Sequence, residues 1–313
     1  MTGFAAAVNT AEQDGIHVTT TGLISLEARC RALRLPSRQP ARSALAGPHQ
    51  SRFRGRGVDY LESRHYLPGD DIRNMDWRVT ARTGKPHTKV FQEERERPVV
   101  VVVDRNPSLF FGTRRQLKSV TAAQLAAAIG WMAVTRGDRI GGVMFGADVH
   151  HEIKPAGGRR GVMRLIQQLG RWCNPESVDG EDNPMGEALL RLRNVVRPGS
   201  LLIIISDFYN LDENCGRHLS RLAQHNDVIG CQVLDDAEEN LPPGRYAITD
   251  GRDQSMLDTY HRGELKKFRS MAEQHRQAPK DLFRRHGAHW FTVSTSQDPI
   301  DVLSRQIRLL RAI

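Results

Sequence analysis

The chain has 313 residues, of which 39% are hydrophobic and 26% charged, and its formal net charge is +9. That length and composition fit a globular protein with one large or two modest cores, and they exclude general disorder and any need for disulfides or a structural metal. No apolar stretch approaches the roughly 18 residues that cross a bilayer, no secretory signal is recognisable, and the four cysteines lack CxxC spacing, so we expect a cytoplasmic protein without a membrane span.

Residues 1–50 are predicted to form an N-terminal arm that packs on the main body. A short helix is expected around Leu23 to Leu35, and it ends near Pro36 and Pro40. The arm also begins a stretch that holds arginines and no acidic residue. These arginines either pair with carboxylates elsewhere or face water, or they meet phosphates, anionic lipid or an acidic partner. They are Arg29, Arg31, Arg34, Arg38, Arg42, Arg52, Arg54 and Arg56.

Residues 51–97 form a second, charged segment that is expected to pack on the main domain. Carboxylates and guanidinium groups alternate there, and the planar fork of arginine engages a carboxylate through two parallel hydrogen bonds. Two roles stay open for such a network, which also includes Glu93 and Glu94. It either fixes the segment to the main domain or forms a docking face for another protein, with aromatic anchors. The predicted docking residues are Tyr66, Asp70, Asp71, Arg73, Asp76, Trp77, Arg78 and Arg82.

From residue 98 to 313, apolar strands alternate with helical patterns. Strands are expected at 98–104, 139–145, 149–153, 201–208, 228–235 and 289–294. Helices are expected at 114–135, 161–169, 185–196, 218–224, 257–286 and 300–310. Such alternation predicts an α/β domain with a doubly wound, mostly parallel sheet of the Rossmann-like kind.

Oxygen-bearing side chains follow two of the most apolar strands. Asp104, Asn106 and Ser108 form a D-x-N-x-S turn after the first buried strand, and Asp207 follows the strand LLIIIS. Ligands of doubly wound sheets bind beyond the carboxyl ends of the strands at the switch point, so we expect these groups to meet at one rim. Hard oxygens of this kind suit Mg²⁺ or Mn²⁺. Alternatively, the aspartates cap strand-to-helix turns.

Several spaced motifs carry a family resemblance. They are RGRGVDYLESRHYLPGDDIRNMDWRVTARTGK, FQEERER, RGDRIGGVMFG and the strand end ISDF. With them the chain resembles the bacterial domain-of-unknown-function family 58 (DUF58), whose members carry a von Willebrand factor A-like domain and are often encoded beside MoxR-type AAA+ ATPases. The resemblance implies a von Willebrand A-like fold with a family-specific N-terminal extension, and a MoxR-type ATPase or other A-domain proteins as partners.

The resemblance also implies a place for a metal-ion-dependent adhesion site. The wider superfamily uses a D-x-S-x-S turn, a distant Thr and a later Asp, which fall here on Asp104, Asn106, Ser108, Asn183 and Asp207. The chain departs from that pattern at two positions, because Asn106 replaces a Ser and no Thr lies near Asn183.

The expected function is therefore a non-catalytic interaction module, an adaptor or co-chaperone with a degenerate metal site. The sequence has no GxSxG, HExxH or GxxxxGK[ST] motif, so no enzyme is expected. Two alternatives stay open. One is a metal-dependent phosphoester hydrolase that uses Asp104 and Asp207, and the other is a nucleic-acid binder that uses the arginine stretch.

Overall fold

The computed structural model describes residues 14–33, 35, 58–93, 96–146, 149–175, 185–249 and 254–311. The chain divides into two compact units, each of which is described by itself. We call residues 1–40 with 97–313 the sheet unit, and residues 41–96 the small unit.

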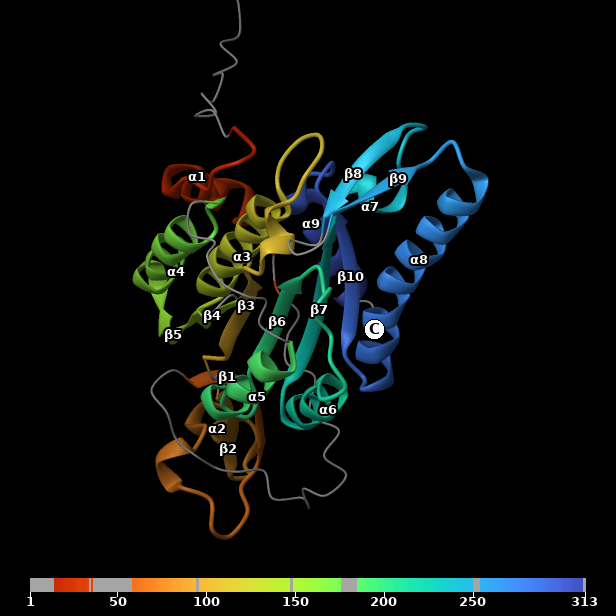
Figure 1. Cartoon of the computed structure of the whole chain (residues 1–313). Helices are drawn as coiled ribbons and strands as arrows, with labels where there is room; N and C mark the ends of the chain where they lie inside the picture. Colours follow the sequence, from red (N-terminus) through yellow and green to blue (C-terminus); the bar gives the residue numbers. More distant parts are fainter. Residues whose placement is uncertain are drawn as a thin grey trace, which may run out of the picture. The chain divides into compact units, whose positions relative to one another are not determined.

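The described part of the sheet unit is built on a six-stranded sheet in the order β10-β7-β6-β3-β4-β5 (Figure 1). Every neighbouring pair is parallel except β4 and β5, which form an antiparallel hairpin at one edge. The strands are β3 (Pro98–Asp104), β4 (Arg139–Gly146), β5 (Val149–Gly157), β6 (Leu201–Ser206), β7 (Asp227–Leu234) and β10 (His289–Ser294). The predicted doubly wound, mostly parallel sheet is confirmed, and its strand order is the Rossmann-like one.

Helices cover both faces of this sheet because its central strands are apolar on both sides. One core contains Val99, Val101 and Val103 of β3, and the other contains Val100 and Val102. The first face is covered by α1 (Thr20–Cys30), α3 (Lys118–Thr135), α4 (Gly158–Trp172) and α9 (Pro299–Arg311). The second face is covered by α5 (Met185–Val195), α6 (Cys215–His225) and α8 (Arg262–Arg285).

The described part of the N-terminal arm, residues 14–33 and 35, packs on the first face. Helix α1 begins after Thr19, whose hydroxyl accepts a hydrogen bond from the backbone N–H of Gly22. The indole N–H of Trp131 in α3 donates to the carbonyl of Leu23 at 3.1 Å. Arg29 pairs with Asp298, so this arginine of the acid-free stretch neutralises a carboxylate of the same unit.

The sequence misplaced one element near the C-terminus. The helix predicted over 257–286 begins only at Arg262, because the preceding residues form the antiparallel hairpin of β8 (Arg245–Thr249) and β9 (Gln254–Asp258). Leu257 is paired with Tyr246 in this hairpin and is buried. Its apolar side chain had fitted the helical pattern equally well, which is the usual ambiguity of a short apolar run.

The small unit is a hairpin with two short helical turns between its strands. Strands β1 (Val58–His65) and β2 (His87–Glu93) pair antiparallel, and between them lie the 3₁₀ turn η1 (Ile72–Asn74) and α2 (Trp77–Thr83). Asp76 caps α2 by accepting from the backbone N–H of Val79, and Gly84 ends it in the left-handed region at φ 70°. The two ends of α2 are thereby fixed.

Candidate functional site

The carboxyl ends of β3 and β6 meet at the switch point of the sheet. These strands are parallel neighbours, with Val103 opposite Ile205, and the chain continues from β3 to β4 on one side and later returns to β6 on the other. Asp104 ends β3 and Asp207 directly follows β6. The prediction that both carboxylates lie at one rim is therefore confirmed.

Asp104 is held in the interior by two hydrogen bonds. Its Oδ1 accepts from the backbone N–H of Asn106 at 2.8 Å, and its Oδ2 accepts from the hydroxyl of Ser206 at 2.5 Å. Burial and the nearby charge of Asp207 raise the pKa of Asp104 to about 7. The chain approaches closely here, because a Cβ on Gly146 at the end of β4 would lie 2.7 Å from the backbone nitrogen of Asn106.

One buried cation of the rim is Lys118, the first residue of α3. Its side chain is fully buried, and its Nζ lies 2.8 Å from Oδ2 of Asp207 and 2.5 Å from Oε1 of Glu238. Burial by itself would lower the pKa of Lys118, but the charges of Asp207 and Glu238 raise it above its ordinary value. The ammonium group therefore stays charged and neutralises two carboxylates.

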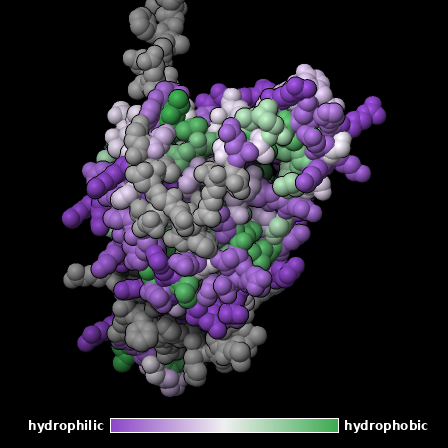
Figure 2. Space-filling view, in the orientation of Figure 1, coloured by the Kyte–Doolittle hydropathy of each residue, from purple (hydrophilic) through white to green (hydrophobic). Residues whose placement is uncertain are grey.

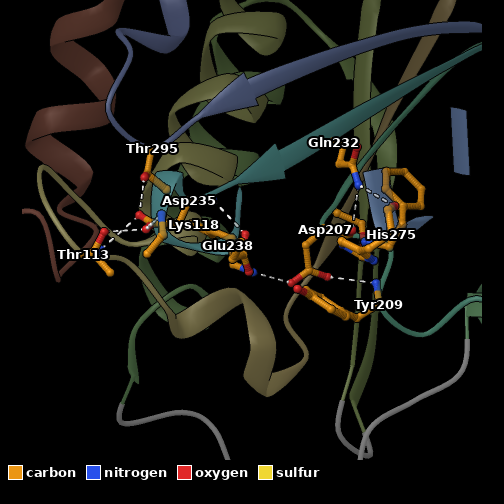
Figure 3. Close-up of polar contacts among 12 residues, drawn as sticks. Thr113, Lys118, Asp207, Tyr209, Gln232, Asp235, Glu238, His275 and Thr295 are labelled. Atoms are coloured by element: carbon orange, nitrogen blue, oxygen red, sulfur yellow. Dashed lines mark hydrogen bonds and ion pairs between the residues drawn. The ribbon is translucent and has the colours of Figure 1, made fainter. Parts of the chain in front are cut away.

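Glu238 is placed by a capping box at the start of α7 (Asp236–Glu239). The carboxylate of Asp235 caps the helix, and Oε2 of Glu238 accepts from the backbone N–H of Asp235 at 2.8 Å. Asp235 also accepts hydrogen bonds from the hydroxyls of Thr113 and Thr295, both at 2.5 Å. Figure 3 shows Lys118 and Glu238 between the group around Asp235 and the group around Asp207.

An aromatic pair lies beside Asp207. The ring of Tyr209 stacks on His275 of α8 with centroids 3.7 Å apart, and Nζ of Lys118 lies 5.2 Å from the centroid of Tyr209 (Figure 3). Between Asp207 and Tyr209, Phe208 has a positive φ of 63°, which is uncommon for a bulky residue. Its ring is buried against Phe283, and this packing holds the left-handed turn that directs Asp207 toward Lys118.

The described residues do not fit a divalent cation well. Oδ2 of Asp207 is already bonded to an ammonium group, and no cluster of three or more His, Cys, Asp or Glu side chains in the described ranges has the spacing of a metal site. The hydroxyl of Ser108 is buried without a hydrogen-bond partner, and Asn106 is buried at the start of the 3₁₀ turn η2 (Pro107–Phe110). Asn183 lies outside the described residues, so binding of Mg²⁺ or Mn²⁺ stays a prediction.

Sequence reasoning missed the two groups that complete the cluster. Lys118 stands on the same helical stripe as Thr121, Leu125 and Met132, all of them buried, and a lysine on a buried stripe is a signal for an internal cation. Glu238 stands three residues after Asp235, which is the spacing of a capping box. Neither pattern reveals that the two side chains meet.

In the small unit, the predicted docking residues divide into partly or fully buried residues with contacts inside the unit and exposed side chains. Asp70 forms a bidentate ion pair with Arg64, Asp71 caps η1, and Asp76 accepts from the hydroxyl of Ser63 at 2.6 Å. Tyr66 is half-buried, and its backbone N–H donates to Pro86. The exposed members are Arg73, Trp77, Arg78 and Arg82.

Comparison with known proteins places the chain among uncharacterised relatives. A family model described as "Protein of unknown function DUF58" matches residues 62–278. Uncharacterised proteins of Mycobacterium bovis and Mycobacterium tuberculosis are each 33% identical to the chain over 217 residues, which cover 69% of this chain and 68% of each relative.

Solved structures resemble the chain only distantly. The hypothetical protein BatB from Bacteroides thetaiotaomicron has a TM-score of 0.44 at 14% identity and covers 69% of this chain and 100% of its own. A von Willebrand factor type A protein from Catenulispora acidiphila has a TM-score of 0.39 at 14% identity, and the match covers 72% of this chain and 43% of that protein. These likenesses carry no argument about function, and the assignment of a doubly wound, mostly parallel sheet rests on the strand order of the chain itself.

The expected cytoplasmic location is wrong by the same comparison. One similar structure is an aerotolerance-related membrane protein from Bacteroides fragilis, with a TM-score of 0.43 at 11% identity over 68% of this chain and 97% of its own. We therefore withdraw the cytoplasmic assignment. Within the described ranges, every helix is too short or too polar to cross a bilayer.

Proposed function

Because this chain belongs to the DUF58 family of proteins of unknown function, we propose from its geometry a non-catalytic protein-binding module. The module acts as an adaptor or co-chaperone for a MoxR-type AAA+ ATPase, alone or together with other von Willebrand A-like proteins. The choice of ATPase rests on the resemblance to a family often encoded beside MoxR-type ATPases. The choice of protein binding rests on the small unit.

The observation that carries the proposal is the exposure of Trp77. This tryptophan is the first residue of α2 and is 66% exposed, and Leu67 and Ile72 of the same unit are exposed as well. Tryptophan dominates the energetic centres of protein interfaces, since it buries a large rigid surface at low entropic cost. Large apolar side chains gathered on one small unit therefore favour a protein partner.

The small unit presents these side chains on a fixed platform. Asp76, which caps α2, also accepts from Ser63 of β1, so the start of the helix is tied to the hairpin. Arg73, Arg78 and Arg82 are exposed. Guanidinium groups beside an aromatic anchor favour a partner pocket that is apolar at its centre and carries carboxylates at its rim.

The sheet rim supports the non-catalytic part of the proposal. A metal-dependent hydrolase needs an open coordination position and an accessible nucleophile. Asp104 and Asp207 are both buried, and their oxygens already accept hydrogen bonds from protein groups. The nucleic-acid alternative is weakened because Arg29 and Arg31, in the acid-free stretch, pair with Asp298 and Glu27.

The test is binding of the full chain to the MoxR-type ATPase of the same organism, with a non-hydrolysable ATP analogue and Mg²⁺. We expect saturable binding that Trp77→Ala weakens. Tyr260→Ala is the matched control, because Tyr260 is an equally exposed aromatic residue of the other unit and should bind as the native chain does. Absence of binding, or equal loss with both variants, would overturn the proposal.

A further inference from the structure

A second exposed apolar surface lies on the sheet unit, and the proposed function does not use it. It consists of the β8–β9 hairpin and the first half of α8, and we call it the hairpin-helix surface. Met256 of β9 and Tyr260, which precedes α8, are 66% and 69% exposed. Ile248 is exposed as well but lies on the opposite face of the hairpin, because Met256 pairs with Ala247 and Ile248 pairs with Ser255. Figure 2 shows hydrophobic residues over the hairpin with hydrophilic residues around them.

The start of α8 adds positive charge directly after Tyr260. Glu264 is the one acidic residue in its first ten, and its carboxylate accepts a hydrogen bond from the backbone N–H of Asp258 at 2.8 Å. Four basic side chains of the same stretch are exposed, and none forms an ion pair with a described residue. They are Arg262, Lys266, Lys267 and Arg269.

The hairpin is held in place from its base. The hydroxyl of Thr259 donates to the carbonyl of Pro242 at 3.0 Å and accepts from the backbone N–H of Gly244 at 2.7 Å. The hydroxyl of Tyr246 donates to the same carbonyl at 2.9 Å, and Leu257 is buried. An isolated two-stranded hairpin is only marginally stable, so these contacts at its base stabilise it. The exposed apolar residues of the hairpin are not covered by the described part of the chain.

We propose that the hairpin-helix surface docks on an anionic lipid bilayer. The exposed side chains of Met256 and Tyr260 enter the boundary between headgroups and acyl chains, and the lysines and arginines of α8 contact lipid phosphates. Long basic side chains suit this position, since their apolar stems lie along the membrane while their charges stay in water.

The composition favours lipid over the other anionic partners. A single-stranded nucleic acid would require several aromatic side chains for base stacking, and Tyr260 is the exposed aromatic residue of this surface. Protein interfaces are depleted in lysine, whereas Lys266 and Lys267 lie near the middle of the basic stretch. The surface shares no residue with the small unit, so membrane docking and partner binding are independent proposals.

The experiment is co-sedimentation of the full chain with vesicles of phosphatidylcholine, with and without phosphatidylglycerol. We expect binding to the anionic vesicles, weak binding to phosphatidylcholine alone, and loss of binding in concentrated salt. Each basic residue near a charged bilayer strengthens binding by about fivefold, so neutralising two of them should weaken it by about 25-fold. The variant for this measurement is the double change Lys266→Gln and Lys267→Gln.

Two further variants separate lipid docking from general charge and from misfolding. The double change Arg284→Gln and Arg285→Gln removes the same charge from the opposite end of α8, where both arginines are exposed, and should leave vesicle binding unchanged. Met256→Ser should weaken binding without changing the thermal midpoint, because the side chain is exposed. Equal binding to both kinds of vesicle, or equal loss with both double variants, would overturn the proposal, as would binding to an acidic polypeptide but to no vesicle.

Discussion

The sheet rim and the small unit use their charged residues in opposite ways. At the rim, Lys118 lies between Asp207 and Glu238; the side chains of Lys118 and Asp207 are buried, and that of Glu238 is largely buried. In the small unit, the acidic side chains cap turns and pair within the hairpin, while Trp77 and the arginines of α2 stay exposed. The polar groups of the rim therefore bond one another, whereas the exposed side chains that the proposed function uses lie in the small unit.

Removal of the buried cation should have the largest effect. Lys118→Met leaves two carboxylates buried without their partner, so we expect a loss of about 3–5 kcal/mol in the free energy of unfolding. Urea denaturation measures this loss, and Lys266→Met is the exposed control, which should change it little. A loss below about 1 kcal/mol would mean that the rim is not organised by its lysine.

The pH dependence of the free energy of unfolding should show a further difference between the sheet rim and the small unit. The pKa of Asp104 is raised to about 7, so between pH 4 and pH 7 the folded chain binds more protons than the unfolded chain. The contribution of Asp104 to stability is therefore present below pH 4 and is lost as the pH rises to 7. Relative to the native chain, Asp104→Asn should become more stable by a few kcal/mol over this interval. A constant difference between the two unfolding curves from pH 4 to pH 8 would contradict the raised pKa.

A change at Trp77 should affect binding and leave stability nearly unchanged. Trp77→Ala removes an exposed anchor, so affinity for the ATPase should fall by about 30-fold, which corresponds to about 2 kcal/mol. The free energy of unfolding should change by less than about 0.5 kcal/mol. A variant that loses stability and keeps its affinity would assign Trp77 to the fold and not to binding.

The ion pair between Arg64 and Asp70 should have the smallest effect. Nη1 and Nη2 of Arg64 donate to the two carboxylate oxygens of Asp70, at 2.9 and 2.8 Å, but Arg64 is partly exposed. Arg64→Gln should therefore cost about 1 kcal/mol or less. Differential scanning calorimetry detects such a change as a small shift in melting temperature. A shift as large as that of Lys118→Met would contradict the expected difference between the ion pairs of the rim and of the small unit.

Sequence patterns located the carboxylates of the rim but not their partner. Asp104 and Asp207 were found because each follows a strongly apolar strand, and parallel strands end at a common edge. Lys118 was missed because it pairs with Asp207 and Glu238, which lie far from it in the sequence. Such a tertiary contact leaves no periodic pattern in the sequence. In the small unit, the alternating charges did not show which residues pair. Asp70 pairs with Arg64, which was not among the predicted docking residues.

The β8–β9 hairpin shows a second limit of sequence patterns. Leu257 and the residues after Arg262 both fit a helical repeat, and only strand pairing separates them. Periodicity identifies an apolar face without telling which element covers it. The four exposed basic residues at the start of α8 were likewise visible in the sequence, but not their place beside Met256 and Tyr260.

We infer that the ammonium group of Lys118 takes the place of the predicted divalent cation at the sheet rim, because it already bonds Oδ2 of Asp207. Isothermal titration of the full chain with MgCl₂ and MnCl₂ tests this claim most directly, with Asp104→Ala as the comparison. We expect no saturable binding at millimolar concentrations and equal heats for both proteins. Saturable binding by the native chain that Asp104→Ala abolishes would contradict the claim and establish the predicted metal site.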